Sequence, residues 1–434
     1  MFDGKTANEQ QISGNSWYLR ALAAVYREFG NAFAYDSIHS IVDKFVVRLA
    51  PFYEKYPVDE DSRDPSKKGE AIGALYTNAV DGWLLSTDTG CAFIALDGFT
   101  SAYDIYPSQA LKELIERMID KFMSIDKVGA HCQTHATLSA ARGIMRYYEK
   151  TKEPGYLEYV KELFGLYTDY GMTRNYANYN WFLRQSWTEP CAIVDSLILA
   201  FSLYEATGEY MYAQAANRIY YNALRFSQRG NGGFGCDSCL DEEDNYLRPN
   251  DKFYEAYWCC TMRGAEGLLC CAENMAKLSD RAVTVLLPEP FDARSESGDV
   301  AFSLDTVLGK HCELKFKIDA WDGARELRVY LPEGYEKLKV SGCRDFTVKN
   351  NFLILKNPSR GEIRAEFCLR PRRRELKEGK SLYSAGDFLL GEFVRHDVAD
   401  NEVFLTERGP LTLVENMMLH SRAEGLSIRQ RLIF

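Results

Sequence analysis

The sequence predicts an α+β multidomain protein in which a long helical region precedes an antiparallel β-sandwich. From about Ser16 to Asp280, apolar residues recur at the 3.6-residue spacing of helices that bury one face. From about Arg281 the period changes to two, which is typical of strands in a half-buried sheet. At 434 residues the chain is also too long for one small core. We therefore expect a helical domain at 1–280 and a β-sandwich domain at 281–434.

The helical region resolves into amphipathic segments joined by short turns such as "TKEPG" and "EATGE", so that it reads as a series of helical hairpins. A further, unusually apolar helix is expected between Asp88 and Asp97. The amphipathic segments lie at 16–30, 36–56, 110–122, 135–150, 156–171, 191–208 and 210–226.

The second region contains short alternating runs bounded by Gly, Pro, Asn and Asp, the pattern of an antiparallel sandwich. The basic run "RPRRRELK", which starts at Arg370, is predicted to be a solvated sheet edge. The alternating runs lie at 282–288, 299–305, 312–321, 326–332, 337–342, 351–357, 362–370 and 409–416.

Composition excludes several classes of partner. A formal charge of -10 argues against nucleic acid, whose binding requires a basic surface. No uninterrupted apolar run approaches the roughly 18 residues of a membrane helix, so no membrane is expected. The start "MFDGKTANEQQ" lacks the features of a signal peptide, and we expect a cytoplasmic protein whose twelve cysteines are thiols and metal ligands. The sequence leaves open whether the chain is a homo-oligomer.

Two cysteine motifs carry the most specific chemistry. "WTEPCAIVDS" places Glu189 and Cys191 at the predicted start of a helix, where Thr188 would be the N-cap. "EAYWCC" adds the adjacent pair Cys259 and Cys260. One carboxylate and three thiolates make a four-ligand set that suits Zn²⁺.

Other interpretations of the cysteines stay open. "CDSC" supplies Cys236 and Cys239 at a spacing that is common in structural zinc sites, so a Cys-only site with 259–260 is an alternative. Cys270 and Cys271 follow on the next helix and are predicted to be packing residues.

With these motifs the chain resembles the β-L-arabinofuranosidase family of glycoside hydrolases, once described only as a domain of unknown function. The similarity runs through "HCQTHATLSAARGIMRYYEKT", "TEPCAIVDSLILAFSLYEATGEYMYAQAANRIYYNAL" and "WCCTMRGAEGLL", and covers roughly residues 80 to 415. The combination of E-x-C and CC is its most specific element. The resemblance implies a six-hairpin α/α toroid followed by β-sandwich domains, and a carbohydrate substrate.

The resemblance also implies roles for the motif residues. Glu189, Cys191 and Cys260 correspond to zinc ligands, and Cys259 corresponds to a nucleophile that is itself bound to the metal. This chemistry is reasonable, because a free thiol with a pKa of about 8.5 is a poor nucleophile at neutral pH, whereas zinc and a helix start favour the thiolate. Attack on the anomeric carbon would give a thioglycosyl intermediate, and water would then release a product of retained configuration.

Residues for substrate binding are expected near two motifs. His131 matches a family histidine through the H-x-x-T pattern, and His135 lies one turn later on the same helix face. Asn180, Trp181 and Trp187 combine amide groups with ring faces, as sugar-binding surfaces do. An equally good interpretation makes these five residues core or loop residues.

The general acid is the weakest part of the resemblance. The family places a glutamate shortly before the E-x-C motif, but 170–187 contains no carboxylate here. Glu255 is the candidate that we select as the acid, because it would lie one turn before Cys259 if the helix already begins there. The alternative is that Glu255 is a solvated carboxylate or one that only supports the site. Asp88, Asp97 and Asp169 are further candidates.

Length suggests alternatives to an active hydrolase. We count about nine helical segments where a complete toroid has twelve, which predicts a shortened N-terminus and an incomplete ring. Together with the missing acid, this leaves open an inactive carbohydrate-binding homologue with a structural zinc. A sugar lyase or epimerase on the same fold is a third possibility.

Overall fold

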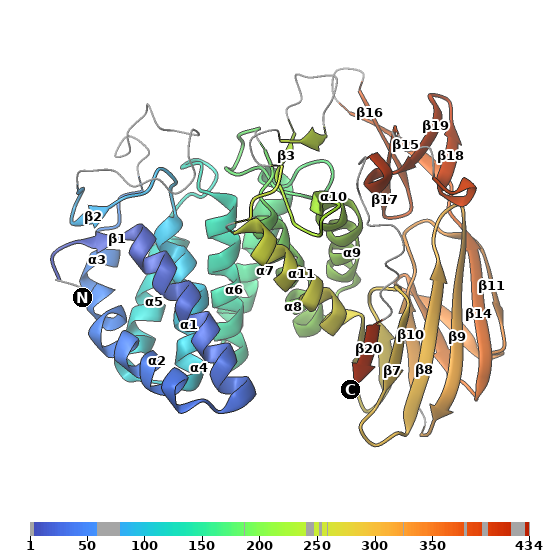
Figure 1. Cartoon of the computed structure of the whole chain (residues 1–434), viewed down its shortest axis with the longest axis horizontal. Coiled ribbons are helices and arrows are strands. Elements are labelled where there is room, and N and C mark those ends of the chain that lie inside the picture. Colours follow the sequence, from blue (N-terminus) through green and yellow to red (C-terminus); the bar gives the residue numbers. More distant parts are fainter. Residues whose placement is uncertain are drawn as a thin grey trace. The chain divides into compact units, whose positions relative to one another are not determined.

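The computed structural model of the chain forms two compact units (Figure 1). Unit 1 comprises Met1–Thr173, Asn178–Leu199 and Asp237–Arg248, and unit 2 comprises Arg174–Ala177, Ala200–Cys236 and Pro249–Phe434. The predicted domain boundary at residue 280 stays a prediction. The structure describes residues 4–58, 79–185, 187–239, 247–250, 254–257, 259–323, 325–376, 380–392, 398–417 and 430–433.

Unit 1 is helical, and the helices coincide with the amphipathic segments of the sequence. Its short strands β1 (Ala7–Asn8) and β2 (Trp83–Leu84) pair in parallel. Its helices are α1 (Glu9–Phe29), α2 (Ala32–Lys44), α3 (Ala50–Tyr53), α4 (Ala95–Ile105), α5 (Gln109–Met123), α6 (Thr134–Thr151), α7 (Pro154–Tyr170) and the first part of α8 (Pro190–Thr207).

Polar side chains define where these helices begin. The side chains of Asn8, Asn31 and Ser108 accept hydrogen bonds from the first-turn N–H groups of α1, α2 and α5, as N-cap residues do. Gly30 ends α1 in the left-handed conformation, and its N–H donates to the carbonyl of Tyr26. These local signals explain why the predicted segments became helices, although α1 begins seven residues before the predicted start at Ser16. The segment predicted as one helix at 36–56 divides into α2, a short 3₁₀ segment and α3.

Unit 2 combines helices with three larger sheets. Helix α9 (Tyr210–Ile219) continues through the π-helical segment η5 (Tyr220–Leu224) into α10 (Arg225–Ser227), and α11 (Cys260–Asn274) follows later in the chain. The sheet orders are β12-β13-β10-β6-β5, β11-β14-β9-β8-β7-β20 and β15-β16-β17-β19-β18.

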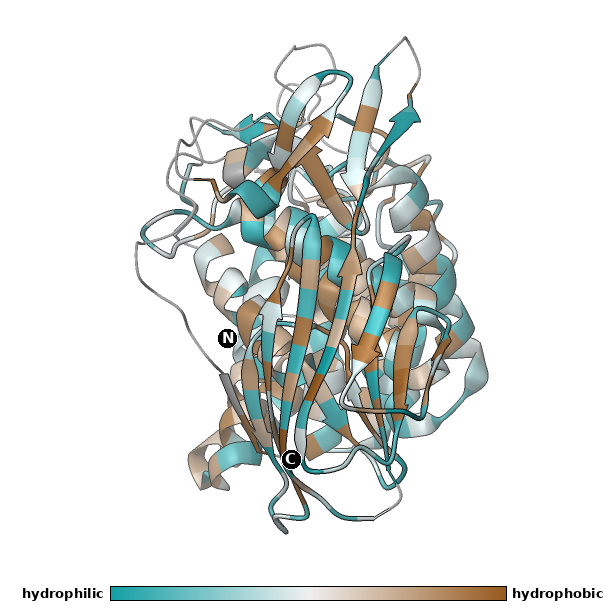
Figure 2. Ribbon diagram, turned by 90° about the vertical axis from the view of Figure 1, so that its right-hand side faces the viewer, coloured by the Kyte–Doolittle hydropathy of each residue, from teal (hydrophilic) through white to brown (hydrophobic). Residues whose placement is uncertain are grey.

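The strands of unit 2 bear out the period-two pattern. Along β8 and β9, buried side chains alternate with more exposed ones, and Figure 2 shows the same banding of hydropathy. The strands are β5 (Ala276–Leu278), β6 (Ala282–Val285), β7 (Phe291–Arg294), β8 (Val300–Val307), β9 (His311–Trp321), β10 (Glu326–Tyr330), β11 (Glu336–Ser341), β12 (Phe346–Lys349), β13 (Phe352–Lys356), β14 (Gly361–Cys368), β15 (Pro371–Glu375), β16 (Ser381–Ala385), β17 (Phe388–Gly391), β18 (Val403–Thr406), β19 (Gly409–Leu413) and β20 (Gln430–Ile433).

The α+β multidomain class is therefore confirmed, with one correction to the sheets. Most neighbouring strands pair antiparallel, but β10 pairs with β6 in parallel, and so does β20 with β7. In each parallel pair the two strands are far apart in sequence, which parallel pairing requires. The basic run forms β15, an edge strand whose arginines are exposed, as predicted.

The sequence contains no uninterrupted apolar run of membrane-spanning length, but helix α8 meets the length and composition of such a segment. By length and composition it is apolar enough to cross a membrane, although 67% of it is buried inside the structure. A mostly buried core helix passes the same test. The expected absence of a membrane partner stays a prediction.

A buried carboxylate joins three helices of unit 1. Asp97 of α4 is 2% exposed, and it pairs with Arg20 of α1 at 3.0 Å. From α6, Arg146 pairs with it at 2.7 Å and Arg142 at 3.6 Å. Burial alone would raise the pKa of Asp97, yet the three guanidinium groups hold it far below its usual range. Asp97 therefore stays ionised and cannot act as a general acid.

Replacing Asp97 by Ala should destabilise unit 1 by about 3–5 kcal/mol, because three guanidinium groups would lose their shared counter-charge in the core. Chemical unfolding followed by circular dichroism measures this. The matched control is Asp319→Ala, which removes the exposed Lys317–Asp319 pair and should cost less than about 1 kcal/mol. The difference between wild type and D97A should shrink as the pH falls below the ordinary aspartate range, because only the unfolded chain then protonates Asp97. Equal costs for the two variants would contradict the analysis.

Candidate metal and active site

The start of α8 is held by backbone and side-chain bonds within unit 1. The carbonyl of Glu189 accepts hydrogen bonds from the N–H groups of Ala192 at 2.9 Å and Ile193 at 3.2 Å. Pro190 is the first helical residue, as predicted. Thr188 was expected to cap the helix, but its N–H and hydroxyl both bond to the backbone of Asp237. Glu189 therefore occupies the cap position, which places its side chain at the mouth of the helix.

The loop before α8 is fixed to the start of α6. The N–H of Glu189 donates to Asn178 Oδ1 at 2.9 Å, and Asn178 Nδ2 donates to Thr134 Oγ1 at 3.1 Å. Thr134 is the first residue of α6, so His135 follows at once. These bonds bring the first turns of α6 and α8 together and set the positions of the side chains that they carry.

His135, Glu189 and Cys191 form a buried group of potential metal ligands. Each offers one ligand atom, and these atoms all lie within 4.8 Å of one another. His135 Nδ1 is 3.5 Å from Glu189 Oε1, and the three residues are 7%, 5% and 0% exposed. Ligands around one tetrahedral zinc lie at such mutual distances, and nitrogen, oxygen and sulfur are its usual donors. The group fits a zinc ion, and it also adds His135 to the ligands expected from the sequence.

Asp195 is a site residue that the sequence reasoning missed. His135 Nε2 lies 3.5 Å from Asp195 Oδ2, opposite the ring nitrogen that faces Glu189. Ser139 Oγ donates to the same Asp195 oxygen at 2.5 Å, and Arg142 Nη1 donates to the other at 2.6 Å. Asp195 thus faces the imidazole from the position in which carboxylates behind metal-ligating histidines commonly lie. Its position one turn after Cys191 was the available signal.

The residues expected to bind sugar lie along two paired segments. Gln133 forms a bridge with Trp181, and the N–H of Thr134 donates to the carbonyl of Asn180 at 2.9 Å. His131 Nδ1 lies 2.8 Å from the carbonyl oxygen of Phe182. The structure therefore brings His131, His135, Asn180 and Trp181 to one place, although their contact with a sugar stays a prediction.

The tryptophans differ in how much they could offer a ligand. Trp181 is 5% exposed, and its Nε1 donates to Asp88 Oδ1 at 2.8 Å. Trp187 is half-buried and packs edge-on against Trp181, with ring centroids 5.7 Å apart. Trp181 is buried and its N–H group is already bonded, so it offers a ligand little surface. Trp187 retains accessible ring surface on which a sugar could pack.

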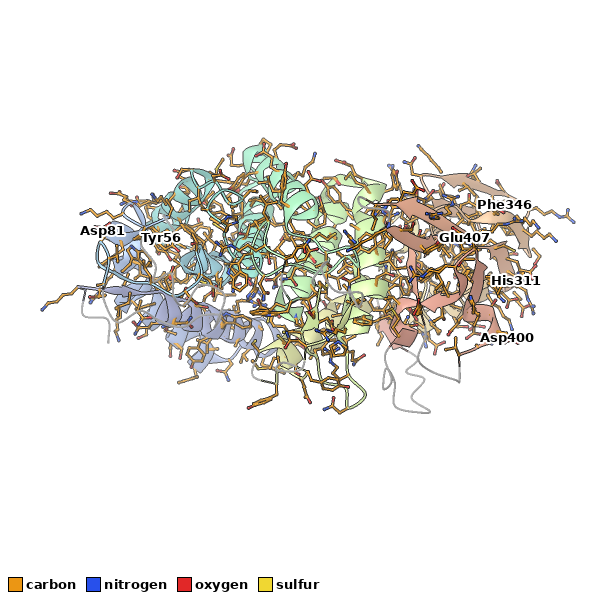
Figure 3. The ribbon with its side chains drawn as sticks, turned by 90° about the horizontal axis from the view of Figure 1, so that it is seen from above. Tyr56, Asp81, His311, Phe346, Asp400 and Glu407 are labelled. Carbon is orange, nitrogen blue, oxygen red and sulfur yellow. The ribbon has the colours of Figure 1, made fainter. Side chains whose placement is uncertain are left out.

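Asp88 belongs to a polar loop that unit 1 holds firmly. The buried Glu9 accepts hydrogen bonds from the N–H of Ser86 and, at 2.6 Å, from the hydroxyl of Tyr56, which Figure 3 labels. The same hydroxyl accepts from the N–H of Gly90 at 2.9 Å. The hydrogen bond from Trp181 Nε1 therefore holds the Asp88 carboxylate against the Trp181 ring.

In unit 2, Cys259 and Cys260 stand at the N-terminus of α11. Cys259 is the N-cap and half-buried, Cys260 is the first helical residue and buried, and their sulfur atoms are 3.7 Å apart. The positive end of a helix dipole favours thiolates at both positions. Two sulfur ligands of one zinc ion lie at a similar separation.

Glu255 is not on this helix, because α11 begins only at Cys260. The expectation that Glu255 precedes Cys259 by one helical turn is therefore wrong. Its carboxylate instead accepts a hydrogen bond from Asn231 Nδ2 at 2.6 Å. A Cβ on Gly233 would approach Glu255 Oε1 to 2.3 Å, so a larger residue there would force the Glu255 side chain to shift. Glu255 is thus fixed in a loop four residues before Cys259.

The remaining cysteines do not form a comparable ligand group. Among the described residues of unit 2, Cys236 joins no set of three potential ligands. The carbonyl of Cys236 accepts a hydrogen bond from Arg229 Nη2 at 2.9 Å. Burial raises the pKa of Cys271 well above its usual range, so its thiol stays protonated. This agrees with the packing role expected for Cys271.

Comparison with known proteins finds similarity in structure but none in sequence. No protein-family model matches the chain, and no curated protein matches its sequence. A solved structure described as a glycoside hydrolase aligns with TM-score 0.59 and 14% identity, over 86% of this chain and 68% of its own. A GH127 β-L-arabinofuranosidase from Geobacillus stearothermophilus T6 aligns with TM-score 0.53 and 12% identity, over 86% and 66%. A further GH127 β-arabinofuranosidase gives TM-score 0.52 and 12% identity, over 86% and 74%.

The chain therefore has the fold of the GH127 β-L-arabinofuranosidases, with a helical region of the six-hairpin glycosidase type followed by β-sheets. It spans about two thirds of the length of the first two of these proteins. At such low identity the similarity concerns the fold, and the chemistry has to be argued from the site.

Protein purified without added metal should contain one zinc per chain, measured by mass spectrometry of the metal. Glu189→Ala should lose most of this zinc, because it removes a ligand from the buried group. The control Cys236→Ala, at another buried position, should keep it. Zinc that survives Glu189→Ala and disappears with Cys236→Ala would instead indicate the Cys-only site.

Proposed function

We propose that the chain is a retaining glycoside hydrolase that uses a zinc-bound Cys259 as its nucleophile, on an arabinofuranoside or a similar fragment of a plant or microbial polysaccharide. The observation that carries the proposal is the buried His135–Glu189–Cys191 group at the start of α8, within a fold shared with GH127 enzymes. An oxygen, a nitrogen and a sulfur donor gathered in a buried place are a ligand set that suits zinc.

The proposed ligand set is Glu189 and Cys191 together with Cys259 and Cys260. The second pair suits this role, because the two sulfur atoms lie 3.7 Å apart at a helix N-terminus that favours thiolates. When bound, zinc would supply the positive charge that keeps the Cys259 thiol deprotonated at neutral pH. His135 is then either a further ligand or the group that orients Glu189.

The reaction would proceed in two displacements. The Cys259 thiolate attacks the anomeric carbon, forming a C–S bond as the glycosidic C–O bond breaks, and Glu255 donates a proton to the leaving oxygen. Glu255 then takes a proton from water, whose oxygen attacks the same carbon and breaks the C–S bond. Two inversions at the anomeric carbon give a product of retained configuration.

A second candidate function is a carbohydrate-binding protein in which the zinc is structural. It is favoured by the lack of any carboxylate at 170–187. It is also favoured by the 3.5 Å contact between His135 and Asp195, which connects the ligand group to the helical core. Turnover of any glycoside would exclude it. A product with ultraviolet absorbance from a new double bond would instead indicate a lyase.

Cys259→Ser should lower turnover of 4-nitrophenyl β-L-arabinofuranoside by at least about a thousandfold, because an alcohol is protonated where the thiol is ionised. Circular dichroism should show the fold intact. Cys343→Ser, a half-buried cysteine in the sheet region, is the control and should keep normal activity. Normal turnover of Cys259→Ser would remove sulfur from the mechanism.

Glu255→Gln should slow hydrolysis of an unactivated disaccharide by about 10²- to 10⁴-fold, because the leaving oxygen loses its proton donor. Hydrolysis of the 4-nitrophenyl glycoside should suffer much less, since nitrophenolate leaves without protonation. Glu273→Gln, an exposed glutamate of α11, serves as the control. An equal loss on both substrates would mean that Glu255 has a structural role.

A further inference from the structure

Unit 2 contains a pocket that plays no part in the proposed reaction. Its volume is about 220 Å³, below that of pockets for drug-sized ligands, so it holds one small ring and not a chain of them. The π-helical segment η5 forms one wall, with Tyr221 and Asn222, and α10 contributes Arg225. The opposite walls come from the sheets and their connections.

The π-helical turn is held against the sheet at this wall. Asn222 Oδ1 accepts a hydrogen bond from the N–H of Leu389 at 2.7 Å, and its Nδ2 donates to the carbonyl of Asp387 at 2.8 Å. Beside it, the rings of Tyr221 and Phe388 lie 4.7 Å apart. Isolated π-helical turns are rare and frequently occur at functional sites. This one brings an aromatic pair to the pocket.

Charge in the pocket favours a ligand that donates hydrogen bonds. Arg225 pairs with Glu289 at 3.0 Å and with Glu415 at 2.6 Å. Burial alone would lower the pKa of Arg225, yet the two carboxylates raise it well above its usual range. Glu402 adds a third carboxylate to the lining. The lining thus carries three carboxylates and one guanidinium group, and that guanidinium already pairs with two of the carboxylates. The excess negative charge would repel an anionic ligand.

Other polar features narrow the class of ligand. The buried hydroxyl of Thr306 in the lining has no hydrogen-bond partner in the structure. A buried hydroxyl without a partner lowers stability, and a ligand in the pocket could supply the missing hydrogen bond. In the described part of the chain, no set of three potential metal ligands falls at Glu289, Glu402 and Glu415, which disfavours a metal ion.

We propose that this pocket binds a single neutral, hydroxyl-rich ring of monosaccharide size. The ring's hydroxyl groups donate to the carboxylates of Glu289, Glu402 and Glu415, while its C–H face packs on Tyr221 and Phe388. The site is separate from the cysteine motifs, so that it would serve the chain as a sugar sensor or an accessory binding site. It does not depend on the proposed hydrolysis.

Saturation-transfer NMR on the intact chain tests the proposal with free L-arabinose, D-galactose and D-glucose, and with inorganic phosphate and ethanolamine as charged probes. At least one sugar should bind and phosphate should not. Thr306→Val and Glu402→Gln each remove one polar group and should weaken sugar binding by about three- to tenfold. Asp400, labelled in Figure 3, begins the short turn η7 (Asp400–Glu402) that carries Glu402, so the second change lies near the surface.

The matched controls are Thr347→Val and Glu366→Gln, on exposed positions of β12 and β14, and both should bind sugar as wild type does. Cys259→Ser should also bind normally, which separates this pocket from the proposed active site. Binding that is lost in Cys259→Ser but kept in both pocket variants would place the sugar at the cysteines and overturn the proposal. So would the absence of sugar binding, or binding of ethanolamine without any sugar.

Discussion

The helical unit depends on a line of buried charges that crosses its core. Asp97 pairs with Arg20, Arg142 and Arg146, and Arg142 also pairs with Asp195. A buried charge without a partner is very costly, so each helix of this set is held where its partner lies. The line links α1, α4, α6 and α8, and it ends at His135, which belongs to the ligand group.

This line explains how the helical core and the candidate metal site are connected. Asp195 faces the imidazole of His135 with one carboxylate oxygen and accepts a hydrogen bond from Arg142 with the other. The position of the ligand group is therefore set by the same contacts that stabilise the core.

Helix starts supply both pairs of proposed ligands, for one physical reason. Glu189 caps α8, and Cys259 caps α11. A helix N-terminus leaves N–H groups unpaired and favours negative charge, which suits carboxylates and thiolates. In each case a local sequence signal, Pro190 or the adjacent cysteines, marked the place. The exact cap residue was less predictable, because Thr188 instead hydrogen-bonds to the backbone of Asp237, which is distant in sequence.

The sequence by itself determined the class of fold, the amphipathic helices, the alternating strands, the exposed basic edge and the E-x-C and CC motifs. These follow from the spacing of residues along the chain, and the spacing is a local property. Only the tertiary structure decided that Asp195 stands behind His135, that Trp181 donates to Asp88, and that two strand pairs in the larger sheets are parallel. It also decided that a π-helical turn lines a pocket in unit 2. Those contacts join residues far apart in the chain, and packing selects them from many partners that the sequence allows equally.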